Sequence, residues 1–193
     1  MEQIGASGFS SVTGLLQTKP SDDRLSPQDA NEIVEACVKM AEVKTGALIV
    51  IERNVSMGDI VSASGVTVDA VISSQLLINI FEDKTPLHDG AVIIRDNRVA
   101  AASCILPVTQ SEIGQELGTR HRAAVGASEV SDAFIIVVSE ETGKISIARD
   151  GKLEKAVSEA VFRQELLNLC EKTTPAGAKA INKIWKGMSR HDK

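Results

Sequence analysis

Short apolar runs alternate along the chain with segments in which apolar residues recur every three or four positions. Residues 47–51, 91–94 and 134–138 are continuous apolar runs, a pattern typical of strands buried on both faces. Helical spacing of apolar residues predicts a first helix that begins after an N-cap at Ser26 and stops at Gly46. Strands and helices therefore alternate from the first apolar segments onward.

The same alternation continues through the second half of the chain. Residues 73–81 are predicted to be helical, and a turn at Asp96-Asn97 is expected to join two strands. Further elements are expected at residues 99–106 (strand), 118–130 (a loop or helix start), 145–148 (strand, ended by Asp150-Gly151) and 153–170 (an amphipathic helix with Val157, Val161, Leu166 and Leu169 inward). Because helices separate some strands and tight turns join others, the fold class is predicted to be α/β, with a mixed central β-sheet and helices packed on both faces.

Three regions differ in composition. Residues 1–25 are rich in Gly, Ser and Thr and are expected to be a flexible lead-in, residues 26–171 to be the folded domain, and residues 172–193 to be a basic tail. The tail has six Lys or Arg residues against Asp192 alone. A basic surface helix or frayed tail is one interpretation, and contact with a partner or an anionic membrane surface is the other.

The overall composition disfavours several classes of protein. With 193 residues, of which 43% are hydrophobic and 24% charged, the chain is typical of a globular protein. A net charge of −5, four Phe, one Trp and no Tyr disfavour a nucleic-acid partner. Three cysteines and three histidines give neither a disulfide framework nor a multi-histidine metal site. No apolar run reaches the length of about 18 residues that a membrane span needs, so this chain is expected to be soluble and cytoplasmic.

Candidate chemistry begins with the segment that precedes the strand at 91–94. His88 and Asp89 are followed there by Gly90 and Ala91, whose small side chains let a ligand approach the backbone. A carboxylate at this point can hold Mg²⁺ or Mn²⁺, or accept a proton from a hydroxyl. The alternative is an ordinary Asp-Gly turn before a strand.

A second cluster combines several phosphate-binding groups. Gly118 and Thr119 precede Arg120, His121 and Arg122, so that two guanidinium groups and a hydroxyl open a small-residue segment. Forked guanidinium donors and free backbone N–H groups suit a triphosphate. The alternative is an exposed basic turn paired with nearby acids.

The third cluster lies after the strand at 134–138. Ser139, Glu140 and Glu141 could complete a metal site with Asp89, or could be solvated turn residues. Neither GxxxxGK[ST] nor GxGxxG between a strand and a helix is present, so a nucleotide would need another kind of cradle. Without GxSxG, a serine hydrolase of the usual kind is disfavoured as well.

Taken together and in order, these motifs resemble the diadenylate cyclase domain, and in particular its membrane-attached CdaA type. The resemblance covers residues 33–165 and includes GALIVIER, SSQLLINIF, TPLHDGAVII, GTRHRAA and VVSEETG. It implies the diadenylate cyclase domain fold and the condensation of two ATP into cyclic di-AMP and two pyrophosphates. Domains of this family act through a divalent metal ion, which the resemblance gives as Mn²⁺, Mg²⁺ or Co²⁺.

The resemblance also implies roles for individual residues. His88, Asp89 and Glu141 would hold the metal, and Asp89 would lie near the attacking ribose 3′-OH. The catalytic set would be Asp89, Arg120, His121 and Arg122. The nucleotide would contact Gly90, Ala91, Ile105, Leu106, Gly118, Thr119, Arg120, His121, Arg122 and Ser139. Relatives often carry Tyr where this chain has Ile105, so an apolar wall replaces ring stacking against the adenine. On this basis, Arg122→Ala is expected to weaken triphosphate binding.

The implied partners follow from the reaction. Each protomer would bind one ATP, so the active species would be a face-to-face homodimer around a twofold axis, open to regulatory protein partners. CdaA-type relatives carry membrane helices ahead of this domain, so the full-length protein is expected to be anchored to the cell membrane with this domain on the cytoplasmic side. The alternatives are a non-catalytic module of the same fold that senses a nucleotide, and a structural scaffold without nucleotide affinity.

Overall fold

The structure is a computed structural model that describes residues 25–111, 114 and 117–170. The expected lead-in before Leu25 and the basic tail at 172–193 lie outside the described residues. Among the residues that are described, no helix combines the length and the apolar character needed to cross a bilayer.

The described chain folds around one seven-stranded sheet. The helices are α1 (Pro27–Glu42), α2 (Gly58–Ser64), α3 (Ser74–Phe81), α4 (Thr119–Val130) and α5 (Glu159–Cys170). The strands are β1 (Ala47–Ile51), β2 (Val66–Val71), β3 (Ala91–Arg95), β4 (Arg98–Cys104), β5 (Phe134–Val138), β6 (Ile145–Arg149) and β7 (Lys152–Glu154). The strand order is β2-β4-β3-β1-β5-β6-β7, in which β1 and β3 run parallel and the other neighbours run antiparallel.

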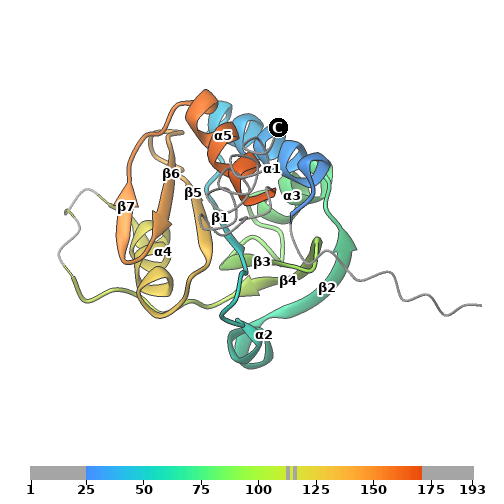
Figure 1. Ribbon diagram of the computed structural model, residues 1–193, viewed down its shortest axis with the longest axis vertical. Helices are drawn as coiled ribbons and strands as arrows, with labels where there is room; N and C mark the ends of the chain where they lie inside the picture. The colour runs from blue at the N-terminus through green and yellow to red at the C-terminus, as the bar shows by residue number, and fades with distance from the viewer. Residues whose placement is uncertain (1–24, 112–113, 115–116, 171–193) are drawn as a thin grey trace, which may run out of the picture.

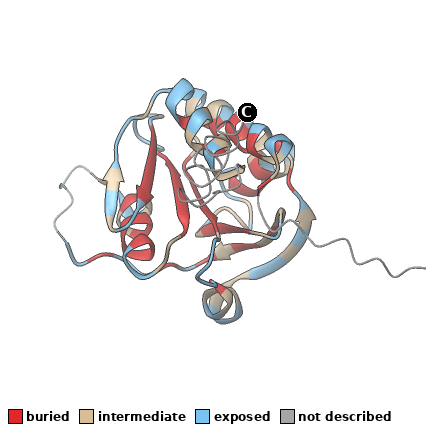
Figure 2. Cartoon of the chain, viewed as in Figure 1, coloured by how far each residue is buried: buried red, intermediate tan, exposed pale blue. Residues whose placement is uncertain are grey.

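Helices cover both faces of this sheet, as the sequence pattern predicted. Helices α1, α3 and α5 lie on one face, whereas α4 and α2 lie on the other (Figure 1). Within β1, Ile49 points into the core under α1, and Leu48 and Val50 point into the core next to α4. The central strands are buried over their full length (Figure 2). This two-sided burial explains why their sequences are continuous apolar runs instead of alternating ones.

The predicted end of the first helix is wrong. Helix α1 ends at Glu42, and Lys44 takes the left-handed conformation with a φ of 58°. The predicted N-cap is correct, because the Ser26 hydroxyl accepts a hydrogen bond from the Asp29 N–H at 3.0 Å. Gly46 therefore has no part in stopping the helix, and its small size has to be explained by its surroundings.

The predicted last helix begins too early. Asp150 and Gly151 both have a positive φ, which makes a tight turn that folds β7 back onto β6. The backbone carbonyl of Ser158 accepts the first helical hydrogen bond from Phe162, and α5 follows from Glu159. Val161, predicted to face inward, has an exposed fraction of 43%, whereas Phe162 and Leu166 are fully buried.

Two elements between residues 58 and 71 had no sequence signal. Helix α2 contains no fully buried residue, and β2 is an edge strand whose residues are mostly exposed. Apolar periodicity is weak in such elements because little of their surface is buried.

Candidate active site

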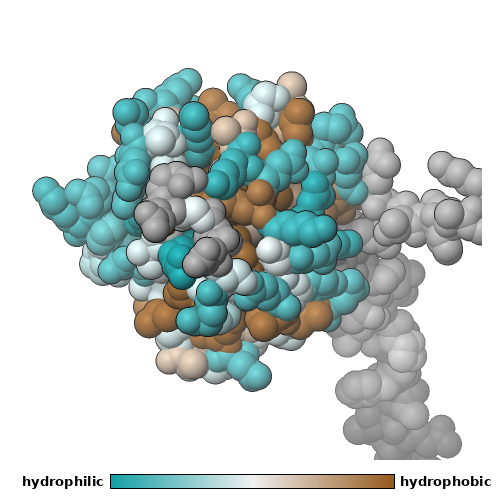
Figure 3. Space-filling model, turned by 90° about the vertical axis from the view of Figure 1, so that its left-hand side faces the viewer, coloured by the Kyte–Doolittle hydropathy of each residue, from teal (hydrophilic) through white to brown (hydrophobic). Residues whose placement is uncertain are grey.

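A pocket of about 960 Å³ opens at one edge of the sheet. The strand register brings the first residues of β1, β3 and β6 to this edge, beside the last residues of β4 and β5. Several loops and the N-terminus of α4 meet there. Seen from the side that carries β7 and α4, the surface is mainly hydrophilic, with hydrophobic residues exposed between (Figure 3).

All three polar clusters predicted from the sequence contribute to this pocket. Its lining includes Asp89 and Gly90, then Gly118, Thr119, Arg120 and His121, and finally Ser139, Glu140, Glu141 and Thr142. Three of the expected site residues, His88, Ala91 and Arg122, are not among the lining residues. Tertiary folding thus brings together most of a set that is spread over residues 88–141.

The loop before β3 presents Asp89 at the rim of the pocket. Gly90 has a φ of +109°, and a Cβ at this position would lie 2.8 Å from the carbonyl oxygen of Cys104. The Ser103 hydroxyl donates a hydrogen bond of 2.7 Å to the Asp89 carbonyl oxygen. Glycine is therefore required here by the backbone conformation and by the close approach of β4, and the exposed Asp89 carboxylate stays available to a ligand.

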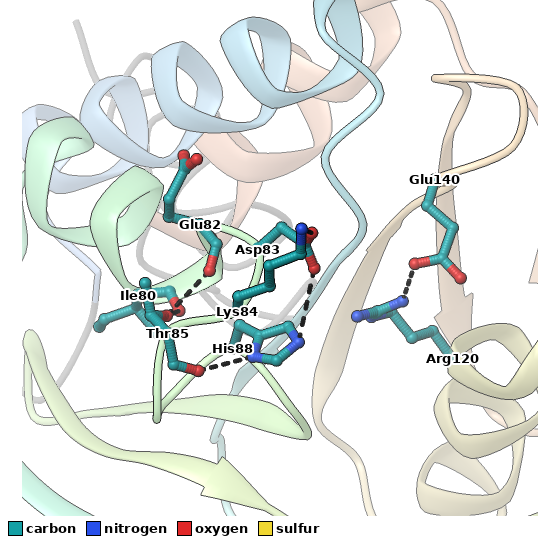
Figure 4. A network of polar contacts seen from close by, with 8 residues as sticks. All are labelled: Ile80, Glu82, Asp83, Lys84, Thr85, His88, Arg120 and Glu140. Carbon is teal, nitrogen blue, oxygen red and sulfur yellow. Dashed lines mark hydrogen bonds and ion pairs between the residues drawn. The ribbon is translucent and has the colours of Figure 1, made fainter.

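His88 lies just outside the pocket, in a network of polar contacts with the end of α3 (Figure 4). Its Nδ1 is 2.6 Å from the carbonyl oxygen of Thr85, so this nitrogen carries the proton. The Thr85 hydroxyl in turn donates to the carbonyl oxygen of Glu82 at 2.8 Å. The Nε2 atom, on the other side of the ring, lies 3.8 Å from an Asp83 oxygen.

The N-terminus of α4 supplies the cationic side of the pocket. Gly118 precedes the helix, and Thr119 and Arg120 form its first turn. The Arg120 guanidinium forms an ion pair with Glu140 (Figure 4). Its Nε atom is buried and has no hydrogen-bond partner among the described residues. A helix N-terminus with an arginine that still has a free donor favours an anionic ligand.

Arg122 does not line the pocket and bonds instead to the segment after β4. Its Nη2 donates a hydrogen bond of 3.1 Å to the carbonyl oxygen of Thr109, whose own N–H bonds to the Arg122 carbonyl oxygen at 3.1 Å. Residues two apart on a helix differ by about 200° in direction, which agrees with Arg120 lining the pocket while Arg122 does not. In this chain, Arg122 ties the segment after β4 to α4.

His121 lines the pocket from a buried position, with an exposed fraction of 7%. Burial lowers its pKa from the usual 6.5, and the nearby Lys155 ammonium acts in the same direction. The Glu141 carboxylate acts in the opposite direction and raises it. His121 is therefore neutral at physiological pH and lies within electrostatic range of both a cation and an anion.

The turn between β5 and β6 carries the carboxylates of Glu140 and Glu141. The Ser139 hydroxyl accepts a hydrogen bond of 3.2 Å from the Thr142 N–H, and Gly143 closes the turn with a φ of +71°. A Cβ on Gly143 would collide with the carbonyl oxygen of Ala41 at the end of α1. The turn is therefore held against α1, which sets the position of both carboxylates.

An apolar wall forms the remaining side of the pocket. Ile105 has an exposed fraction of 74% and Val108 of 43%, although both are large hydrophobic residues. The Ile105 N–H donates a hydrogen bond of 2.9 Å to the Ser64 hydroxyl, and Leu106 is buried behind it. Exposed aliphatic residues beside polar groups suit a flat heterocyclic ring.

Lys155 is the main pocket residue that the sequence analysis missed, and Lys144 and Ser64 also line the pocket without having been predicted. Lys155 follows β7 in a segment that the pattern assigned to a helix. The Asp150-Gly151 turn was the available signal, because a hairpin there returns the chain to the edge where β5 ends.

The pocket supports some chemistries and disfavours others. Cys104 lines it, but burial raises the pKa of this thiol to about 11, so it is not a thiolate nucleophile at neutral pH. The described residues contain no group of three or more His, Cys, Asp or Glu side chains close enough to hold a metal ion. Two carboxylates that share one pocket with an arginine and a helix N-terminus instead suit the binding of a metal–phosphate ligand.

Comparison with known proteins identifies a family and several relatives. The family profile described as "DisA bacterial checkpoint controller nucleotide-binding", abbreviated DAC, matches residues 34–153. Cyclic di-AMP synthase CdaA of Bacillus subtilis is 46% identical over 167 residues, which are 86% of this chain and 59% of that protein. A diadenylate cyclase of Listeria monocytogenes is 46% identical over 165 residues, which are 83% of this chain and 60% of that protein. The chain thus spans about three fifths of the length of these relatives.

Solved structures resemble the fold as well. A double mutant of DacA from Staphylococcus aureus matches with a TM-score of 0.73 and 44% identity, covering 75% of this chain and 97% of that one. A protein of Bacillus cereus described as a hypothetical membrane spanning protein matches with a TM-score of 0.63 and 45% identity, covering 68% of this chain and 64% of that one.

Proposed function

The chain belongs to the DAC family of nucleotide-binding domains, and from this premise we propose that it is the catalytic part of a diadenylate cyclase. Its reaction would condense two ATP molecules into cyclic di-AMP and two pyrophosphates. The observation that carries the proposal is the convergence on one pocket of Asp89, Glu141 and Arg120, whose buried Nε has no partner among the described residues.

The reaction consists of two equivalent displacements. In each one, the 3′ oxygen of one ATP bonds to the α-phosphorus of the other, and the bond from that phosphorus to pyrophosphate breaks. The 3′ proton passes to a base, for which the exposed Asp89 carboxylate is our candidate. Such phosphoryl chemistry depends on positioning and charge stabilisation and needs no Ser or Cys nucleophile.

The cationic side of the pocket would bind the triphosphate. Arg120 would donate to phosphate oxygens, helped by the Thr119 hydroxyl and the first N–H groups of α4. His121 and Ser139 lie on the same side, and Lys155 adds a further positive charge. The adenine would pack against Ile105 and bond to the backbone of Leu106. Gly90 would leave room for the ribose beside Asp89.

The residues present fit a divalent cation such as Mn²⁺, Mg²⁺ or Co²⁺. The Asp89 and Glu141 carboxylates are hard oxygen donors that line the pocket, and His88, whose Nδ1 bonds to the Thr85 carbonyl oxygen, would offer Nε2 as a further ligand. When bound, the ion would neutralise phosphate charge and polarise the reacting phosphorus. Three such side chains do not converge within the described residues of one chain, so phosphate oxygens, water or a second copy would complete the coordination.

A second copy is also required by the reaction itself. One pocket takes one ATP, and each 3′ oxygen must reach the phosphorus of the other nucleotide. We therefore propose a face-to-face homodimer around a twofold axis as the active species. We further propose that the full-length protein is anchored to the cell membrane with this domain on the cytoplasmic side, where it could meet regulatory proteins; the description of the Bacillus cereus relative supports this.

Incubation with ATP and each of the three metals tests the activity. We expect cyclic di-AMP and pyrophosphate in a ratio of one to two, measured by liquid chromatography and a pyrophosphate assay. ATP binding without product under any metal would instead favour a nucleotide sensor of the same fold. Absence of thermal stabilisation by ATP would favour a scaffold without nucleotide affinity.

A further inference from the structure

Gly46 is a buried glycine between α1 and β1, at the edge of the sheet where the pocket lies. Its φ lies outside the left-handed range, so the backbone conformation does not require glycine. It precedes Ala47, which pairs with Val138 at the end of β5. Gly46 therefore lies opposite the start of the turn that carries Glu140.

Space explains this glycine. A Cβ at position 46 would lie 2.7 Å from Arg120 Nη1, 3.0 Å from Arg120 Cζ and 2.8 Å from Glu140 Oε2. These three atoms belong to Arg120 and Glu140, the two residues of the ion pair drawn in Figure 4. The three atoms nearest to this methyl group all belong to the far ends of two long side chains, so the backbone could keep its path while the ion pair moved.

The position of that ion pair matters for the pocket. Arg120 and Glu140 both line it, and the buried Arg120 Nε is the donor without a partner among the described residues. We propose that Gly46 is a positioning residue for the nucleotide site, because its missing side chain leaves the space in which Glu140 holds the Arg120 guanidinium. This inference rests on the proposed function, since it assigns Arg120 to the triphosphate of ATP.

Binding of 3′-deoxy-ATP tests the proposal separately from catalysis. This analogue keeps the triphosphate but lacks the attacking hydroxyl, so that its affinity is measured without turnover. For Gly46→Ala we expect the affinity, measured by calorimetry with Mg²⁺, to fall by about tenfold, since small displacements of binding groups are costly. Activity with ATP should show a raised KM with a smaller change in kcat.

Stability distinguishes positioning from a general structural role. Gly→Ala at a compatible φ reduces the entropy of the unfolded chain, which opposes the cost of moving the ion pair, so the Tm of Gly46→Ala should stay close to that of the wild type while the affinity falls. Gly58→Ala is the matched control: Gly58 begins α2 outside the pocket, and its Cβ would lie 3.3 Å from the Ser56 hydroxyl oxygen. It should leave the affinity unchanged.

A double-mutant cycle identifies the group that is displaced. In an Arg120→Ala background, Gly46→Ala should change the affinity by less than about twofold, because the guanidinium is no longer there to be moved. Wild-type affinity in the Gly46→Ala single mutant, or an equal loss in both backgrounds, would overturn the proposal. If the wild-type protein bound 3′-deoxy-ATP but formed no cyclic di-AMP, the proposed catalysis would fail, and the affinity series would still decide the role of Gly46.

Discussion

The two sides of the pocket are built differently. Asp89 is exposed on a loop that backbone contacts and a glycine hold against β4. On the other side, Arg120 and His121 belong to the first turn of α4: His121 is buried, and the partly buried Arg120 is paired with Glu140, whose turn packs against the end of α1. The carboxylate side is accessible to metal and substrate, whereas the cationic side is preorganised before any ligand arrives. We expect the first side to control the rate and the second to control affinity.

Asp89→Asn should have the largest effect on the rate. The amide can neither take up the 3′ proton nor bind a metal ion as strongly, so activity should fall by at least about 10³-fold. The affinity for 3′-deoxy-ATP without metal should change little, as measured by calorimetry. Near-normal turnover would show that the carboxylate side does not control the rate.

Arg120→Ala should have the largest effect on affinity. Loss of a charge-assisted contact to the triphosphate should weaken 3′-deoxy-ATP binding by about 10- to 100-fold. Arg122→Ala is the informative comparison, because the sequence predicted the same role for it. In the structure Arg122 bonds to Thr109. Its replacement should therefore lower the Tm, and should weaken 3′-deoxy-ATP binding less than Arg120→Ala does. Equal losses of affinity would mean that Arg122 also reaches the nucleotide.

Lys155→Ala should give a smaller loss of affinity. An exposed ammonium contributes less than a partly buried guanidinium, so we expect a decrease of about three- to tenfold. The substitution also removes a cation that lowers the pKa of His121. The pKa of His121 should therefore rise, which an NMR titration can measure. An unchanged pKa of His121 in Lys155→Ala would show that Lys155 does not act on the cationic side of the pocket.

The smallest expected effect is on the pH dependence of stability. The pKa of His121 is lower in the folded protein than its usual 6.5, so the unfolded chain takes up the proton first as the pH falls. The free energy of unfolding should therefore decrease below pH 6.5 and be unaffected by this group above it. Denaturant titrations at a series of pH values give the free energy of unfolding at each pH. The dependence of this free energy on pH should differ between the wild type and His121→Gln only in that acidic range. Parallel pH profiles would contradict the burial of a neutral imidazole.

Local patterns were sufficient where an element is buried and regular. The apolar runs of β1, β3 and β5 predicted strands covered on both faces, and Ser26 predicted the start of α1. Exposed elements such as α2 and β2 bury too little surface to leave a periodic signal. The end of α1 at Glu42 was missed, since the left-handed residue that follows it is Lys44, which has no signature comparable to that of glycine.

The candidate site also combines features that were predictable from the sequence with features that were not. The sequence by itself determined which residue types were available, because carboxylates, guanidinium groups and glycines at loop positions can be recognised from local chemistry. Only the tertiary structure decided that Arg120 faces the pocket while Arg122 faces Thr109, and that a hairpin brings Lys155 close to His121. The physical reason is that direction and distance depend on helix phase and strand register, which are set when separate segments pack against one sheet.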